Sequence, residues 1–220
     1  MSTKNIAVIL SGCGGKDGAE ITEAVSTLIS LSQNGVTYKV FAPDIDIIPT
    51  NHLTTKSMTN EKRNLMVEAA RISRGDVTEI AALKSDEFDA VIFPGGLGAA
   101  LHLSTWAQQG AGCSVLPEVK RVIEEFYNAS KPIGAICIAP VLVAKVLGKY
   151  NITITLGQDD KEAIKEVQKT GAIHEVCPVE DYITDRLNKV ITTPAYMCKA
   201  KPHQIFKGIS GLVKELVEMA

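Results

Sequence analysis

Short apolar runs rich in Val and Ile alternate along the chain with longer segments in which apolar residues return every three or four positions. The runs predict buried strands, and the three-to-four spacing predicts amphipathic helices. Strands are expected at 6–10, 36–41, 89–93, 132–136 and 152–156, near Val176, and at 189–192. Helices are expected from Glu20 to a stop at Gly35, at 62–74, after Pro117, at 138–147 and 161–169, and from His203 onward. This alternation predicts an α/β fold, a three-layer sandwich with a mostly parallel sheet and helices on both faces.

Two stretches do not follow either pattern. Residues 44–60 are polar and contain proline, which predicts loops with one short hairpin, and residues 97–116 form an insertion that holds the only tryptophan, Trp106. Linkers, repeats and low-complexity segments are absent from the sequence, so residues 1–220 are expected to form a single domain.

Composition and charge narrow the classes of function. The chain has 220 residues, is 45% hydrophobic and carries a formal net charge of -2, which gives no electrostatic reason to expect nucleic acid or an anionic membrane as partner. Apolar runs are all shorter than the roughly 20 residues of a membrane span. The run 6–10 is too short for a signal-peptide core and lacks a cleavage site after it, which predicts a cytoplasmic protein.

The five cysteines are scattered along the chain and include no CxxC pair. Free thiols are therefore expected, without a disulfide framework or a zinc ribbon. Four isolated histidines have no partner at metal-ligand spacing: His52, His102, His174 and His203. His174 and Cys177 could share a metal, but a lone pair in a polar stretch is typical of a surface, so no metal is expected.

Cys137 stands out because it lies between a β-branched strand and the following helix. A thiol there lies near the positive end of a helix dipole, which favours the thiolate. The same turn directs backbone N–H groups, notably that of Ile138, toward the sulfur, as in a nucleophile elbow. The alternative interpretation is a buried cysteine that packs as a small hydrophobe.

Two glycine-containing turns lie at the ends of other strands. Residues 94–98 (Pro-Gly-Gly-Leu-Gly) could bring backbone N–H donors close to a substrate oxygen, or could simply form a tight turn that needs positive φ. Residues 11–18 only partly match a dinucleotide motif, since Asp17 occupies the position of its last glycine, and no Walker motif is present. No cofactor is therefore expected.

Three acids at the start of the first helix allow two interpretations. Asp17, Glu20 and Glu23 could complement the helix dipole, as acids near a helix N-terminus usually do. Alternatively, Glu23 borders an inward stripe formed by Ile21, Ala24, Val25 and Leu28, where partial desolvation would raise its pKa and suit it to proton transfer.

Taken together, these segments resemble the ElbB glyoxalase group, in the PfpI-like branch of the class I glutamine amidotransferase-like superfamily. The resemblance covers nearly the whole chain in order and rests on these segments: 11–14 (Ser-Gly-Cys-Gly), 17–23 (Asp-Gly-Ala-Glu-Ile-Thr-Glu), 41–44, 63–75, 93–100, 137–140 (Cys-Ile-Ala-Pro) and 192–197. It implies a flavodoxin-like sandwich that often forms a homodimer.

The resemblance also implies roles for five residues. Cys137 would be the reactive elbow cysteine, Glu23 the acid that hydrogen-bonds its thiol, and Gly95, Gly96 and Ile138 the backbone oxyanion positions. Protease-type relatives place a histidine directly after the nucleophile, where this chain has Ile138, and no histidine occurs near 154–159. This departure argues against peptidase and amidase activity.

Two hypotheses of different classes follow. The first is an enzyme, a cofactor-independent glyoxalase of the glyoxalase III type that converts the small dicarbonyls glyoxal and methylglyoxal into glycolate and lactate through a Cys137 hemithioacetal. The second is a protein without turnover, a redox or carbonyl-stress sensor or a regulatory protein linked to isoprenoid biosynthesis, in which Cys137 is oxidised or ligated.

Overall fold

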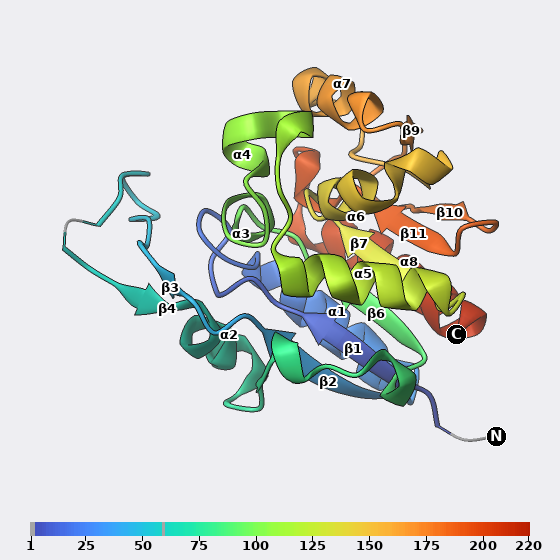
Figure 1. Cartoon of the computed structure of the whole chain (residues 1–220), viewed down its shortest axis with the longest axis horizontal. Helices are drawn as coiled ribbons and strands as arrows, with labels where there is room; N and C mark the ends of the chain where they lie inside the picture. The colour runs from blue at the N-terminus through green and yellow to red at the C-terminus, as the bar shows by residue number, and fades with distance from the viewer. Residues whose placement is uncertain (1–2, 59) are drawn as a thin grey trace.

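The computed structural model describes residues 3–58 and 60–220 and centres on a seven-stranded sheet (Figure 1). The strand order is β10-β11-β7-β6-β1-β2-β5, and every neighbouring pair is parallel except β10 and β11. The strands are β1 (Asn5–Ile9), β2 (Thr37–Ala42), β5 (Thr78–Glu79), β6 (Ala90–Phe93), β7 (Ile133–Ile136), β10 (Ile183–Asp185) and β11 (Val190–Thr193). The central strands β1, β6, β7 and β11 are almost wholly buried, as parallel strands covered on both faces must be.

Helices cover both faces of this sheet. On one side, α1 (Ile21–Gln33) packs against α8 (Pro202–Met219), and α2 (Leu65–Ser73) lies beside β2. On the other side, α5 (Pro117–Asn128) packs against α6 (Pro140–Leu147), and both contact β7. The structure is therefore the predicted flavodoxin-like three-layer α/β sandwich.

Several shorter elements complete the fold. Helices α3 (Gly98–Leu101), α4 (Trp106–Gln109) and α7 (Lys161–Lys169) gather at one end of the sheet in Figure 1. Two small sheets pair β3 (Asp46–Ile47) with β4 (Arg63–Asn64) and β8 (Thr153–Ile154) with β9 (Ile173–His174). Single 3-10 turns occupy Ile80–Ala82, Ser85–Glu87, Gly110–Gly112, Gly148–Tyr150 and Ala195–Met197.

Two strand predictions are wrong in detail. The run 152–156 supplies only β8, which pairs with β9 outside the main sheet, and Val176 lies just beyond β9 in irregular chain. The predicted hairpin near 44–60 corresponds to the β3–β4 pair and a bridge between Thr50 and Ser57.

Helix α1 is oriented differently from the predicted inward stripe. Ile21, Val25 and Ile29 are 50%, 39% and 44% exposed, whereas the polar residues Glu23, Ser26, Thr27 and Ser30 are buried with Ala24 and Leu31. The apolar spacing therefore identifies a helix correctly but assigns its buried face wrongly. This orientation turns Glu23 into the interior.

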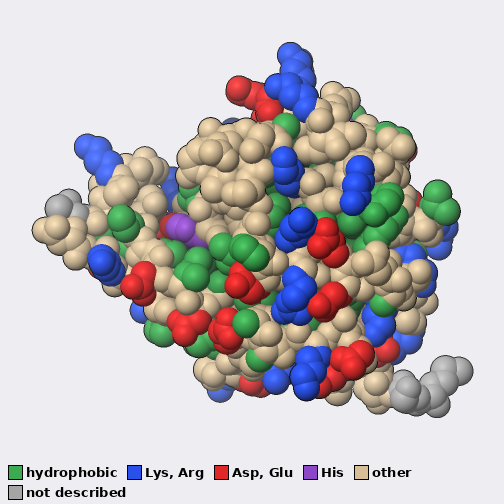
Figure 2. Space-filling model, viewed as in Figure 1, with side chains coloured by type: hydrophobic (Ala, Val, Ile, Leu, Met, Phe, Trp, Pro, Cys, Tyr) green, Lys and Arg blue, Asp and Glu red, His purple; other side chains and the backbone are tan. Residues whose placement is uncertain are grey.

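Surface features agree with the near-neutral composition. Basic and acidic side chains are interspersed on the face shown in Figure 2. Within the described residues, no helix combines the length and apolar character needed to cross a bilayer.

The buried face of α1 can be tested by comparing the same substitution at two positions. Leu31→Ala should lower the free energy of unfolding by about 2–5 kcal/mol, because Leu31 is 0% exposed and truncation leaves a cavity. Leu187→Ala, at a residue that is 92% exposed, should change it by about 0.5 kcal/mol or less. Urea denaturation measures both; a loss for Leu31→Ala as small as that for Leu187→Ala would contradict the burial of Leu31 on the inward face of α1.

Candidate functional site

Cys137 occupies a strained turn between β7 and α6. Its φ is +61°, a left-handed conformation that is uncommon for a residue with a side chain. The Cys137 N–H donates to the carbonyl oxygen of Thr193 at the end of β11, at 2.9 Å. This neighbouring strand fixes the turn, which places the sulfur at the carboxyl ends of the parallel strands, where ligands bind in such sheets.

Two glycine loops interlock beside this turn. Glu20 N–H donates to the Gly95 carbonyl at 2.9 Å, and in return Leu97 N–H donates to Gly15 at 2.9 Å and Gly98 N–H to Gly18 at 3.0 Å. Gly96 has φ +96°, and a Cβ there would collide with the backbone of residues 18–20. Position 96 therefore requires glycine for two reasons: the positive φ, and the close approach of the neighbouring backbone.

Glu23 reaches the site from the first turn of α1, where it is 0% exposed. Its Oε1 accepts a hydrogen bond from the Tyr196 N–H at 3.2 Å. Its Oε2 is buried without a well-aligned hydrogen-bond partner, although the Cys137 thiol is close enough to influence the pKa of the carboxyl. A Cβ on Gly95 would lie 2.6 Å from Oε2 and would also collide with the Cβ of Cys137, so the absence of that side chain allows the two groups to meet.

Burial controls the protonation of both groups. Desolvation raises the pKa of the Glu23 carboxyl to about 8, against the opposing effect of the Tyr196 amide, so the protonated acid predominates at neutral pH. Desolvation also raises the pKa of the Cys137 thiol well above 9, and the charge of Glu23 raises it further. The prediction that the helix dipole favours the thiolate is therefore wrong for the resting protein, because Cys137 is only 7% exposed and burial outweighs the dipole.

The three predicted oxyanion residues divide between two partners. The Gly96 and Ile138 amides interact with the Cys137 sulfur and lower the pKa of its thiol. The Gly95 amide instead interacts with the Glu23 carboxyl and lowers its pKa. Of these three residues, Gly96 and Ile138 thus have N–H groups beside the sulfur, and Gly95 does not.

Cys137 opens into a cavity of about 230 Å³. The cavity is lined by Gly15, Glu20, Gly96, Leu97, Cys137, Ile138, Asp160, Tyr196 and Met197. The sequence did not identify Asp160 as a lining residue, nor the hydrogen bond that the Tyr196 N–H donates to Glu23. Tyr196 itself, in the motif segment 192–197, was expected in the core or in a pocket wall, and it lines the cavity. Cys13 and Cys198 lie on segments that approach the site, but neither residue lines this cavity.

The described residues lining this cavity include no histidine, in agreement with the sequence. His174 accepts a hydrogen bond from the Leu156 N–H at 3.1 Å, and the Cys177 thiol donates to the Pro178 carbonyl at 3.4 Å, so each has another partner. Across residues 3–58 and 60–220, no three His, Cys, Asp or Glu side chains are arranged to hold a metal ion.

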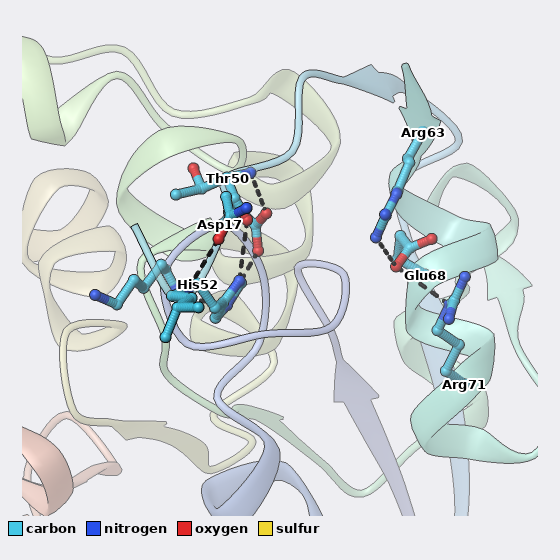
Figure 3. Close-up of polar contacts among 9 residues, drawn as sticks. Asp17, Thr50, His52, Arg63, Glu68 and Arg71 are labelled. Atoms are coloured by element: carbon cyan, nitrogen blue, oxygen red, sulfur yellow. Dashed lines mark hydrogen bonds and ion pairs between the residues drawn. The ribbon is translucent and has the colours of Figure 1, made fainter. Parts of the chain in front are cut away.

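Asp17 belongs to a separate polar cluster, shown in Figure 3. Its carboxylate accepts from the Thr50 N–H at 2.6 Å and lies 3.5 Å from His52, while the Glu68 carboxylate lies between Arg63 and Arg71. These contacts attach the β3–β4 region to the first glycine loop. Asp17 therefore supports the loop and lies in a cluster separate from Glu23.

The sequence of this chain is similar to those of known proteins. Residues 8–186 match the sequence profile of the DJ-1/PfpI family. The ES1 protein homolog, mitochondrial, of Rattus norvegicus is 44% identical across 97% of this chain and 83% of its own length. The human glutamine amidotransferase-like class 1 domain-containing protein 3, mitochondrial, is 43% identical across 97% of this chain and 82% of its own length.

A solved structure is also similar along its whole length. It is described as an isoprenoid biosynthesis protein with an amidotransferase-like domain from Ehrlichia chaffeensis, with a TM-score of 0.91, 36% identity and 99% coverage of both chains.

The predicted cytoplasmic location is contradicted by these relatives. Three of them, from rat, human and Danio rerio, are named mitochondrial proteins. The prediction was wrong because the short apolar run at 6–10, on which it was based, does not distinguish between reducing compartments.

The raised pKa of Glu23 makes stability depend on pH. Between about pH 4.5 and 8 the folded protein holds a proton that the unfolded chain releases, so the free energy of unfolding should fall as pH rises, by up to about 1.4 kcal/mol per unit. Glu23→Gln should remove this slope, whereas the exposed Glu218→Gln should keep it. Urea denaturation across this range measures the effect; equal slopes in the parent and Glu23→Gln would contradict the buried acid.

Proposed function

The chain belongs to the DJ-1/PfpI family, and from this premise we propose that it is a cofactor-independent glyoxalase of the glyoxalase III type within the ElbB group. Its substrates would be small dicarbonyls, with glyoxal converted to glycolate and methylglyoxal to lactate. The observation that carries this proposal is the buried Glu23 carboxyl, with a pKa of about 8, against the Cys137 thiol. The motifs shared with the ElbB group support the finer assignment.

The first step joins the thiol to the aldehyde. The Cys137 sulfur bonds to the aldehyde carbon, the electron pair of the C=O π bond moves to oxygen, and the proton from sulfur passes through Glu23 to that oxygen. The product is a hemithioacetal. The Gly96 and Ile138 amides are the donors nearest the sulfur and would stabilise the developing negative charge.

The second step moves a proton between adjacent carbons. The Glu23 carboxylate removes the hydrogen from the carbon bound to sulfur, and the electron pair of that C–H bond forms the C=C bond of an enediolate while the π pair of the neighbouring C=O moves to its oxygen. The same carboxyl returns the proton to the neighbouring carbon, and the hydroxyl proton on the carbon bound to sulfur passes to the neighbouring oxygen, so that the C=O group now lies beside sulfur. A thioester on Cys137 results, and water hydrolyses it to the hydroxy acid and the free thiol. A carboxyl with a pKa of about 8 suits this exchange, because both its forms are populated near neutral pH.

The sensor hypothesis receives less support from the geometry. Redox-sensing cysteines are exposed and have a low pKa, since the thiolate is the oxidised species. Cys137 is only 7% exposed and burial raises the pKa of its thiol. A regulatory role linked to isoprenoid biosynthesis rests on the name of the Ehrlichia chaffeensis relative and is the alternative if turnover is absent.

Turnover of methylglyoxal by metal-free protein tests the proposal directly. The value of kcat/KM should rise about tenfold per pH unit toward pH 8 and then level, because Glu23 must lose its proton to act as base. Cys137→Ala should abolish lactate formation, and Glu23→Gln should lower it by about 10²–10⁴-fold. Cys13→Ala is the matched control, since Cys13 does not line the cavity. Equal turnover by the parent and Cys137→Ala would refute the mechanism.

We further propose that the chain forms a homodimer, as the resemblance implies, through the apolar stripe of Ile21, Val25 and Ile29 on α1. This stripe is exposed on the single chain, and a second copy of the same stripe would bury it. Val25→Glu with Ile29→Glu should convert dimer to monomer in sedimentation equilibrium while the far-ultraviolet spectrum stays unchanged. A parent protein that is monomeric at micromolar concentration would contradict this assembly.

A further inference from the structure

The reaction proposed for Cys137 ends with a step for which Glu23 is poorly placed. Water must hydrolyse the thioester on the sulfur, and a general base that takes a proton from water accelerates such a step. Glu23 is 0% exposed, lies against the thiol and does not line the cavity into which Cys137 opens. Water that enters this cavity therefore does not reach the Glu23 carboxyl directly, and another proton acceptor on the cavity wall would serve the step better.

Among the described residues, two carboxylates line this cavity, those of Glu20 and Asp160. Asp160 is exposed, and its side chain accepts from the Ala163 N–H at 2.9 Å at the start of α7. Glu20 is half-buried, and its N–H donates to the Gly95 carbonyl at 2.9 Å. Gly95 in turn packs against Cys137, since a Cβ on Gly95 would collide with the Cβ of the cysteine. Glu20 is thus the carboxylate that the interlocked loops hold beside the sulfur.

The Glu20 side chain is fixed in place and keeps capacity to accept a further hydrogen bond. Glu20 is the N-cap of α1, and its Oε2 accepts from the Glu23 N–H at 2.7 Å. A carboxylate has about four lone-pair sites, so capping the helix does not prevent it from accepting from water. Desolvation raises the pKa of the Glu20 carboxyl, against hydrogen bonds from the first residues of α1, and this makes its carboxylate a stronger base.

We propose that Glu20 is a catalytic residue of this reaction, as the general base that activates water to hydrolyse the thioester on Cys137. The Glu20 carboxylate takes one proton from water, the water oxygen bonds to the acyl carbon, and the π pair of the C=O bond moves to its oxygen. When the C=O bond re-forms, the electron pair of the C–S bond moves to sulfur, which takes up the proton held by Glu20. The hydroxy acid, the free thiol and the Glu20 carboxylate result.

The inference rests on the proposed function, but hydrolysis at Cys137 can be measured without a dicarbonyl. The reagent para-nitrophenyl acetate transfers its acetyl group to a thiol and releases para-nitrophenol, and gel filtration then removes the excess. Loss of the acetyl group from each cysteine is followed by peptide mass spectrometry at neutral pH. The acetyl group on Cys137 should disappear about 10²-fold or more faster from the parent than from Glu20→Gln. Glutamine keeps the side-chain oxygen that caps α1.

Three comparisons distinguish a base from a structural role. The acetyl group on Cys13, which does not line the cavity, should be lost at the same rate from the parent and from Glu20→Gln. Hydroxylamine cleaves thioesters without a general base, so it should remove the acetyl group from Cys137 at similar rates in both proteins. Glu79→Gln alters a carboxylate that caps the 3-10 turn Ile80–Ala82 outside the cavity, and it should keep the parent rate.

Three results would overturn the inference. The first is loss of the acetyl group from Cys137 as fast in Glu20→Gln as in the parent, and the second is a greater slowing in Asp160→Asn than in Glu20→Gln. The third is a parent protein in which Cys137 is not acetylated at all, because a sulfur closed to the ester would also be closed to water from the cavity.

The methylglyoxal assay separates the two proposals. Loss of the acetyl group that depends on Glu20, in a protein without methylglyoxal turnover, would remove the glyoxalase and leave the base. Methylglyoxal turnover that depends on Cys137, with equal deacetylation rates in the parent and Glu20→Gln, would leave the glyoxalase and remove the base.

Discussion

The site depends on a desolvated contact between one carboxyl and one thiol. In contact with water, the Glu23 carboxyl would be ionised at neutral pH. Because it is buried, it stays largely protonated, next to the Cys137 thiol. The interlocked glycine loops make this contact possible, since side chains at positions 95 and 96 would collide with their surroundings. Both pKa values are raised by the same exclusion of water, so the two groups share their protons as a unit.

Burial of this kind has an energetic consequence for the fold. Folding places the ionisable Glu23 in the interior, on the buried side of α1, which also carries Ser26, Thr27 and Ser30. Because the charged form of Glu23 is disfavoured there, stability is lower at pH values above its folded pKa than in mild acid. An apolar residue at this position would avoid this cost, and a buried acid with a raised pKa is typical of a functional site.

The sequence was sufficient to predict the sandwich, because the alternation of strand and helix patterns is local. It also located Cys137 between a strand and a helix. The pairing of β8 with β9 could not be predicted, since an apolar run does not specify its partner strand. The inward face of α1 was predicted wrongly. The spacing of apolar residues defines a stripe along the helix, but it does not show whether that stripe packs on the core or lies at the surface. The direction of the shift in the Cys137 thiol pKa was also predicted wrongly, because desolvation raises this pKa and depends on tertiary packing.

The shared protonation of Glu23 and Cys137 can be observed most directly by infrared spectroscopy of protein with ¹³C-labelled glutamate, using Glu23→Gln to assign the band. We expect a protonated-carboxyl band from Glu23 that is present at pH 7, falls to half its intensity near pH 8 and is lost at higher pH. A Glu23 carboxyl already ionised at pH 6 would contradict it.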